Sequence, residues 1–400
     1  LSWLNMVRNR IWHRNGIMTI EKKLLGISPS GDGPTDVAEV FSTYLYTGNA
    51  GVNAINNGID LAGEGGLIWL KGRDAASSHT LHDTERGVNS RLSAQNTSAA
   101  ATSGLTSFNS NGFTLSATQA GELTNASNAE YASFTFRKKS GFFDCVTYSG
   151  NGVAGREIAH GLDGPVGMLI VKCTSHAQNW AVWHKGIPNT HYLRLNGNNA
   201  FNSGSTYWNN TTPTNTVFTV GTDHEVNVSG KTYVAYLFAD NSSEDAEEQM
   251  IKCGSYSGTG NTTVNIDLGW EPQWIMVKRV DSNTDFLDYQ SWIIQDTMRG
   301  LNPAPKESAN GFSSLLLANK NVAEGYRGNG SGTANNQHQF LLTSNGFQAG
   351  PNGAVEFNRG SEAKYIYMAI RAPMMIEPTA ATDVFNIDTA GANGDGVAPN

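Results

Sequence analysis

Charged side chains are scarce in this chain, and so are cysteines and long apolar runs. Asp, Glu, Lys and Arg make up only 16% of the 400 residues, and the net charge is −8. An acidic chain without basic patches is a poor match for a nucleic acid or an anionic membrane surface. No apolar run reaches the roughly eighteen residues of a membrane-spanning helix, and no signal-peptide pattern opens the sequence. We therefore expect no nucleic-acid partner and no membrane insertion.

The three cysteines, Cys145, Cys173 and Cys253, are too far apart to form a CxxC metal pair. An odd number cannot pair completely, and a chain of this size does not need a disulfide framework. We predict that they are reduced, buried thiols with a packing role and no chemistry.

Glycine, by contrast, is abundant, with 44 residues, and hydrophobic residues make up 39% of the chain. That apolar content is enough for more than one buried core. Asn is also frequent, and Gly and Asn favour tight turns between short strands over long helices. The composition predicts an all-β protein.

The sequence repeats one pattern three times. Each copy opens with a strand that ends in Tyr-Thr/Ser-Gly, at residues 41–49, 143–151 and 251–261. A dense apolar run follows and ends in a lysine: Lys71, Lys172 or Lys278. Such runs are typical of strands buried on both faces. Each copy closes on an alternating aromatic strand, at 131–136, 233–238 and 365–370.

The spacing between these landmarks supports the repeat. Lys71 lies 65 residues before Phe136, and Lys172 lies 66 before Phe238. Lys278 lies 92 residues before Ile370, so the third copy carries an insertion, which we place within residues 302–339, where turn formers crowd. We predict modules at 41–140, 141–249 and 250–373, with 374–400 as a linker or the start of a further module.

Short alternating strands joined by Gly/Asn turns predict three tandem β-sandwich or jelly-roll modules, linked in series. We expect each aromatic closing strand to pack against the lysine-terminated run of the opposite sheet. Before the first module, residues 1–40 form an arm in which Trp3, Leu4, Val7 and Ile11 have helical spacing. This short helix either packs on the first module or docks on another subunit.

The titratable residues do not suggest an enzyme. Glycoside hydrolysis needs two carboxyl groups on either side of a sugar site, but Glu244, Asp245, Glu247 and Glu248 lie in an inter-module linker. Asp60, Asp163 and Glu271 each follow a turn glycine, which favours turn hydrogen bonding. His79 and His82 lack further ligands at metal-site spacing, so we expect surface polar residues. The sequence predicts no catalytic residue, no metal and no cofactor.

The first and third copies share an Asp-Thr-x-Arg-Gly element. Asp83 and Arg86 carry it in the first copy, and Asp296 and Arg299 in the third; the second copy has His184-Lys185-Gly186 there. The aspartate can close a turn and the arginine can bridge back to it. We expect this turn role, with a contact between modules or with another chain as the alternative.

One stretch of the second copy has the composition of a sugar-binding surface. Aromatic rings stack on the apolar face of a pyranose, while amides hydrogen-bond its hydroxyl groups. Tyr207, Trp208, Asn209 and Asn210 combine both groups in an Asn-rich loop region. A glycan surface is one interpretation, and core packing is the other.

Taken together, these motifs resemble a known family. Tyr-Thr-Gly-Asn at 46–49, the run ending at Lys71, His-x-Leu-x-Asp-Thr-x-Arg-Gly at 79–87 and Tyr-Trp-Asn-Asn at 207–210 are similar to modules of tail-fibre or virion proteins of marine tailed bacteriophages. Those modules are of concanavalin A-like lectin type, and the resemblance spans about 41–373.

The resemblance implies a non-enzymatic virion component, most simply a tail fibre or spike that attaches to host-surface glycans. Such a protein is assembled in the host cytoplasm and exposed on the extracellular particle, beside other virion subunits, and a homo-oligomer such as a trimer is plausible. Two alternatives remain: an architectural capsid-decoration or baseplate protein, and a polysaccharide depolymerase.

Overall fold

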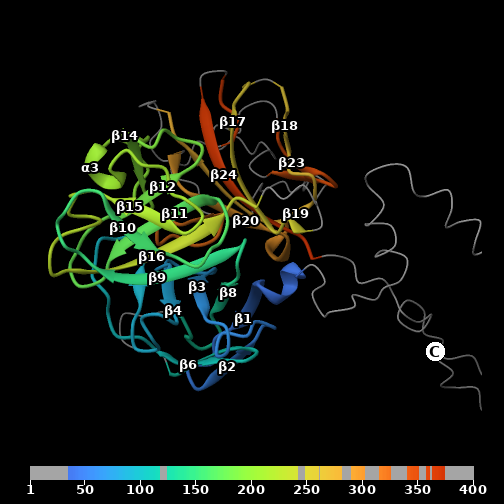
Figure 1. The fold of residues 1–400 in the computed structure, drawn as a ribbon. Coiled ribbons are helices and arrows are strands. Elements are labelled where there is room, and N and C mark those ends of the chain that lie inside the picture. Colours follow the sequence, from blue (N-terminus) through green and yellow to red (C-terminus); the bar gives the residue numbers. More distant parts are fainter. Residues whose placement is uncertain are drawn as a thin grey trace, which may run out of the picture.

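The computed structural model describes residues 35–117, 124–241, 248–260, 262–281, 290–301, 315–325, 340–350, 357–360 and 363–373. Their regular secondary structure consists almost entirely of β-strands in antiparallel sheets, which confirms the predicted all-β class (Figure 1). Within them, no helix is long and apolar enough to cross a membrane. The predicted N-terminal helix, the insertion at 302–314 and 326–339, and residues 374–400 lie outside this described part.

Residues 41–137, which we call module 1, follow a short 3-10 helix, η1 (Val37–Glu39). A large sheet has the strand order β1-β8-β3-β4-β5, and a small sheet has the order β2-β7-β6. The strands are β1 (Phe41–Thr47), β2 (Asn53–Asn56), β3 (Gly66–Gly72), β4 (Thr80–Asp83), β5 (Leu92–Ser93), β6 (Leu105–Asn109), β7 (Gly112–Leu115) and β8 (Glu130–Arg137).

Residues 143–239 form module 2 with the same plan. Its large sheet has the order β14-β13-β12-β11-β16-β9, but its small sheet has only two strands, β10 and β15. The elements are β9 (Phe143–Ser149), β10 (Arg156–Ala159), β11 (Val166–Cys173), β12 (Trp180–His184), β13 (His191–Arg194), β14 (Asn202–Ser203), α3 (Ser205–Trp208), β15 (Val217–Val220) and β16 (Thr232–Ala239).

Residues 251–371 form module 3. The large sheet has the order β17-β24-β19-β20-β21 and the small sheet β18-β23-β22. The elements are β17 (Ile251–Ser257), β18 (Val264–Asp267), β19 (Pro272–Arg279), β20 (Ile293–Asp296), η4 (Thr297–Arg299), β21 (Leu316–Leu317), β22 (Leu341–Thr343), β23 (Gly346–Ala349) and β24 (Lys364–Arg371).

The lysine-terminated runs are the central strands β3, β11 and β19, and they are buried on both faces almost throughout, as predicted. Each is hydrogen-bonded to the aromatic closing strand of its own module, for example with Leu67 opposite Phe136. The prediction that these two strands face each other from opposite sheets is therefore wrong. A strand buried on both faces has the same sequence pattern whether a second sheet or another module covers it.

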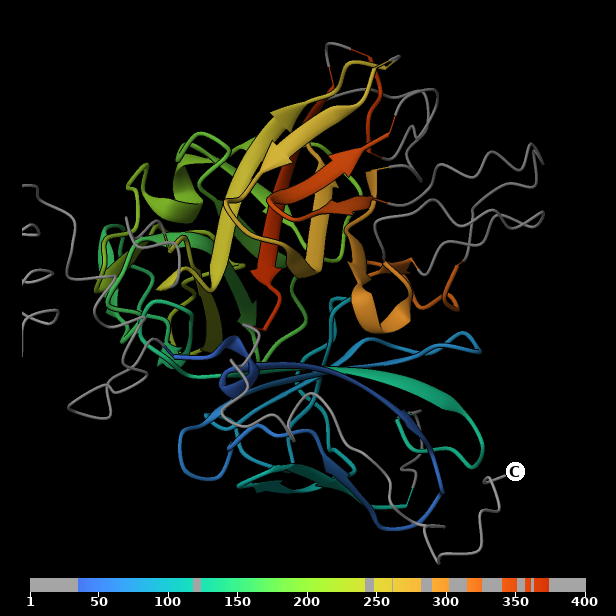
Figure 2. The same cartoon turned by 90° about the vertical axis from the view of Figure 1, so that its right-hand side faces the viewer.

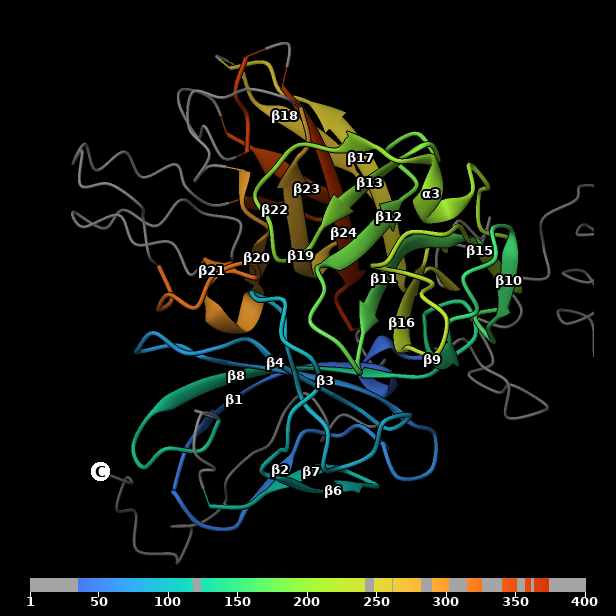
Figure 3. The same ribbon diagram turned by 90° about the vertical axis from the view of Figure 1, so that its left-hand side faces the viewer.

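The three modules follow one another along the chain, and their large sheets pack against one another. Their outer faces and the interior of module 2 form one continuous apolar cluster, whereas modules 1 and 3 each have a separate inner cluster. Trp274 of module 3 lies 5.9 Å from Phe134 and 6.1 Å from Phe136 of module 1, measured between ring centroids. Phe136 also lies 5.4 Å from Phe238 of module 2. In Figures 2 and 3 the large sheets meet in the middle, and the small sheet of module 1 (β2, β6, β7) lies on the side away from the other modules.

Each central strand carries its lysine into the interior. Lys278 is 0% exposed; its ammonium donates to the Gln290 carbonyl and lies 5.5 Å from the centroid of the Trp292 ring. Burial lowers the pKa of Lys278 to about 7, and it lowers those of Lys71 and Lys172 to about 8. Because the unfolded chain holds this proton up to about pH 10.4, protonation of Lys278 opposes folding.

Replacing Lys278 by methionine should therefore stabilise the protein by about 1–2 kcal/mol at pH 7, because the variant avoids the cost of burying an ammonium. Between pH 7 and pH 10 the unfolded wild type binds one proton more than the folded state at this site, so wild-type stability should rise with pH by about 1 kcal/mol per unit. Urea unfolding of both proteins across this range should show the advantage of the variant shrinking as the pH rises and reversing before pH 10, because the wild type gains about 3 kcal/mol over the three units. An advantage that stays constant with pH would contradict this account.

Candidate functional site

The Asp-Thr-x-Arg-Gly element of module 1 forms a turn and a joint with module 2 at the same time. The Asp83 carboxylate accepts hydrogen bonds from the Arg86 backbone N–H (2.9 Å) and the Arg86 Nε (2.6 Å). It also accepts one from the Tyr236 hydroxyl of module 2 at 2.7 Å. The side chains of Asp83 and Arg86 are 0% and 5% exposed. Both roles considered for this element therefore occur together.

Module 3 repeats this arrangement against module 1. Asp296 accepts from the Arg299 backbone N–H (3.0 Å) and Nε (2.6 Å), and both side chains are 0% exposed. The guanidinium lies 5.6 Å from the centroid of the Phe134 ring of module 1. By strand register, Phe134 occupies the position in β8 that Tyr236 occupies in β16. Burial raises the pKa of the Asp296 carboxyl, against the opposing effect of Arg299.

His184 takes the place of this aspartate in module 2, at the position where the sequence analysis placed His184-Lys185-Gly186, and its contact with module 3 was not predicted. Its Nδ1 accepts from the Gly186 N–H (2.9 Å), so its proton resides on Nε2, which donates to the Tyr367 carbonyl of module 3 at 3.1 Å. Burial lowers the pKa of His184 to about 4 and keeps the ring neutral. One sequence signal was available: Asp83 and His184 both lie 12 residues after the lysine of their module.

The opposite ends of the same strands form a second set of contacts. The Trp180 indole N–H of module 2 donates to the Ser93 carbonyl of module 1 (3.1 Å). The Trp292 indole of module 3 likewise donates to the Arg194 carbonyl of module 2 (2.9 Å). The two donors, Trp180 and Trp292, each lie opposite the lysine of the central strand in their own module. The two acceptors, Ser93 and Arg194, lie at equivalent positions of β5 and β13, each on the far side of the strand that pairs with the central strand.

His79 holds the corresponding position in module 1 and is 0% exposed, so its expected place on the surface is wrong. Its Nδ1 accepts from the Trp69 indole at 2.9 Å. Burial holds its pKa well below the usual range, against the opposing effect of the Leu317 backbone of module 3. His82 is also buried, with its Nδ1 3.0 Å from the Ser103 hydroxyl.

Arg299 over Phe134 joins module 3 to module 1. The His184–Tyr367 bond joins module 2 to module 3, and the Tyr236–Asp83 bond joins module 2 to module 1, so the contacts close a ring.

A buried asparagine at the outer end of each module is a further feature that the sequence analysis missed. In module 2, Asn227 Nδ2 donates to the carbonyls of Val153 (2.9 Å) and Gly221 (2.8 Å), and its Oδ1 accepts from the Asn151 N–H (3.0 Å). This amide fixes the loop after the first strand to the loop before the last. The equivalent residues are Asn125 in module 1 and Asn358 in module 3.

The residues predicted as a glycan surface lie partly in the interior. Tyr207 is 4% and Trp208 1% exposed, so for these two rings the structure supports the core-packing interpretation. The Tyr207 ring is stacked at 3.7 Å on Tyr192, and its hydroxyl accepts from Arg194 at 3.2 Å. Asn209 and Asn210 are exposed, with φ of 51° and 53°, and form the turn that ends α3. A sugar can reach these two amides from outside but cannot stack on the two rings.

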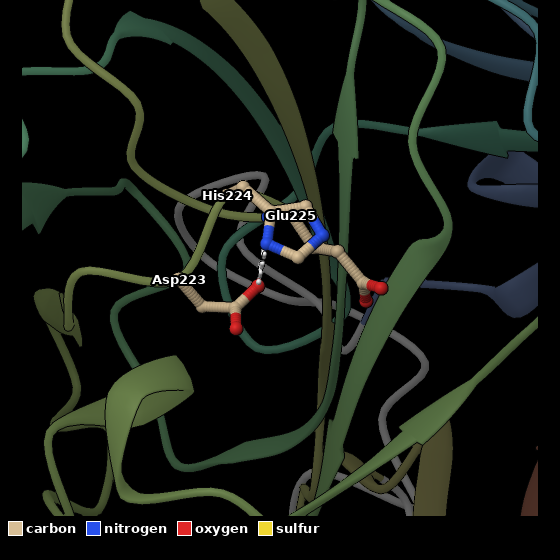
Figure 4. Close-up of side chains that lie close together, drawn as sticks. All are labelled: Asp223, His224 and Glu225. Carbon is tan, nitrogen blue, oxygen red and sulfur yellow. Dashed lines mark hydrogen bonds and ion pairs between the residues drawn. The ribbon is translucent and has the colours of Figure 1, made fainter.

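Asp223, His224 and Glu225 are the one group within the described residues whose ligand atoms lie close enough together for a metal ion. Figure 4 shows the His224 ring beside the Asp223 carboxylate. The Glu225 oxygens are already occupied: they accept from Asn179 (2.6 Å) and Arg194 (2.6 Å). Because Arg194 already neutralises that carboxylate, the group does not make a convincing metal site.

The other titratable residues discussed above show mainly structural roles. Asp60 accepts from the Gly63 N–H at 2.8 Å, as expected for a turn aspartate. The three cysteines are buried and free, which confirms the prediction of unpaired thiols. Of the acidic linker, only Glu248 belongs to the described residues.

Module 2 also contains a cavity of about 450 Å³. Trp183 forms part of its lining, Asn189, Thr212 and Asn215 contribute amides and a hydroxyl, and the ion pair between Lys185 and Asp240 lies in its wall. A volume in this range is typical of small-molecule sites.

A protein-family model described as "Domain of unknown function (DUF7483)" matches residues 36–373, a range that covers all three modules. No protein of curated function matches the chain.

Proposed function

Since the chain belongs to this DUF7483 family, whose description assigns no activity, we propose a function from its motifs and architecture. The protein is a non-enzymatic structural component of a bacteriophage virion, a tail fibre or spike that contributes to attachment to host-surface glycans. The resemblance of its motifs to tail-fibre modules supports a place in a virion. The arrangement of the modules supports attachment through several weak contacts.

The observation that carries the proposal is the closed ring of three sandwiches. Asp83 and His184 form hydrogen bonds between modules. Arg299, which is paired with Asp296, lies over the Phe134 ring of module 1. The large sheets are buried against one another, and exposed loops remain on each module. A rigid body that presents several similar modules suits adhesion by many weak contacts, whose combined strength exceeds that of each contact.

The test combines location and binding. Antibodies against the full chain, detected by immunogold electron microscopy, should label the tail of the particle. The fluorescently labelled chain should bind host cells, and purified host surface polysaccharide should compete for that binding. Label confined to the capsid, with no cell binding, would establish the architectural alternative instead. Release of reducing sugar from that polysaccharide would establish the depolymerase.

A further inference from the structure

Part of the lining of the cavity in module 2, formed by Thr212, Pro213 and Asn215, comes from the stretch before β15, where modules 1 and 3 have an additional strand. In those modules β7 and β23 are paired on both sides, whereas the equivalent β15 pairs with β10 alone. The residues at the corresponding distance before β15 are 210–214, and they include Pro213, which has no N–H to give to a sheet. Thr214 instead closes a tight turn, in which its hydroxyl accepts from the Val217 N–H at 3.0 Å.

The walls of this cavity combine one aromatic ring with neutral polar groups. The Trp183 side chain is 3% exposed, and the described residues offer no acceptor to its indole N–H. Thr212 and Asn215 stand at the exposed rim, and Asn189 donates to the Thr212 hydroxyl at 3.2 Å. Amides and hydroxyls both donate and accept, as the hydroxyl groups of a sugar do.

The two charges in the wall neutralise each other. Lys185 pairs with Asp240, and Asp240 also accepts from the Cys253 N–H of module 3 at 3.0 Å, which fixes the carboxylate in place. A site whose charges are already paired gives no advantage to an anionic or a cationic ligand.

We propose that this cavity binds one neutral pyranose unit of a glycan, with the indole N–H of Trp183, unpaired within the described residues, and the polar groups at the rim hydrogen-bonding to the sugar hydroxyls. This inference rests on the proposed function and names the ligand class and the module. It assigns the site to module 2, because in modules 1 and 3 the corresponding stretch is paired in the small sheet as β6 or β22.

The experiment uses the full chain and saturation-transfer NMR with the methyl glycosides of glucose, galactose, mannose and N-acetylglucosamine at millimolar concentration. At least one glycoside should receive saturation. Asn215→Trp, which places a large side chain at the exposed rim, should reduce the effect at least tenfold. Asn199→Ala, another exposed position of module 2, is the matched control and should leave the effect unchanged.

Absence of saturation transfer for all four glycosides, or an undiminished effect in Asn215→Trp, would overturn the inference. A cell-binding assay distinguishes failure of the cavity as a sugar site from failure of the proposed role in host attachment. Cells bound equally well by Asn215→Trp and by the wild type would place attachment elsewhere on the protein. Glycoside binding without any cell binding would support the cavity and contradict the role in attachment.

Discussion

Replacing Trp274 by alanine should destabilise the protein by about 3–5 kcal/mol, the range for removing a large aromatic side chain from a packed core. Trp274 is 0% exposed and contacts three rings of module 1, with centroid distances of 6.1 Å to Phe41, 5.9 Å to Phe134 and 6.1 Å to Phe136. The substitution therefore leaves a cavity between two modules rather than within one.

Because the cavity lies between modules 1 and 3, the variant should also change how the protein unfolds. Because the modules share one apolar cluster, the wild type should unfold in a single cooperative transition. Trp274→Ala should separate module 1 from the rest, so that urea unfolding shows two transitions and a protease cuts near residues 138–142. Val52→Ala, at a side chain that is 77% exposed, is the control and should change neither result. Unaltered stability in Trp274→Ala would mean that the modules are held together by other contacts.

The sequence predicted the modules because the apolar runs and closing strands keep their spacing. It could not predict the ring, because Leu67 on the outer face and Ile68 on the inner face look alike in a fully apolar run. Which apolar side chain meets its own module and which meets a neighbour depends on contacts between residues far apart in the chain. The tandem order of the modules was therefore predictable from the sequence, whereas their packing against one another was not.

The candidate sites show the same limit. The turn in which Asp83 binds Arg86 is local, over three residues, and could be predicted from the motif alone. The hydrogen bond from Tyr236 to Asp83 spans 153 positions, and the one from His184 to Tyr367 spans 183, so neither leaves a local pattern. Composition left both an exposed surface and core packing open at Tyr207. The partner that stacks on this ring and buries it, Tyr192, lies on the separate strand β13, so the local sequence could not decide between them.

The ring also bears on oligomeric state. In an oligomer with closed symmetry, equivalent surfaces of identical chains bury one another, and here three unequal copies within one chain already do so. The bonds from Trp180 to Ser93 and from Trp292 to Arg194 occupy equivalent places in two of the interfaces. A homo-trimer of this chain would therefore have to use surfaces other than the large sheets.

Removing one member of the buried pair in module 3 should have a comparably large effect. Arg299→Met leaves the Asp296 carboxylate, which is 0% exposed, without its counter-ion, and should cost about 3–5 kcal/mol at pH 7. The double substitution Asp296→Asn with Arg299→Met should recover at least about 2 kcal/mol, because it removes the uncompensated charge. Arg86→Met in module 1 is the matched comparison and should cost less, since the Tyr236 hydroxyl still donates to Asp83.

The pH dependence of the stability of Arg299→Met tests whether the unpaired Asp296 carboxylate causes the loss of stability. Burial already raises the pKa of Asp296 in the wild type, and loss of Arg299 should raise it further. A carboxyl whose folded pKa exceeds its unfolded value makes the protein more stable as the pH falls, because the folded state then binds more protons. The deficit of Arg299→Met relative to the wild type should thus shrink between pH 7 and pH 5, while that of the double variant should stay level. Equal deficits at both pH values would show that lost packing over Phe134, rather than the stranded carboxylate, weakens this joint.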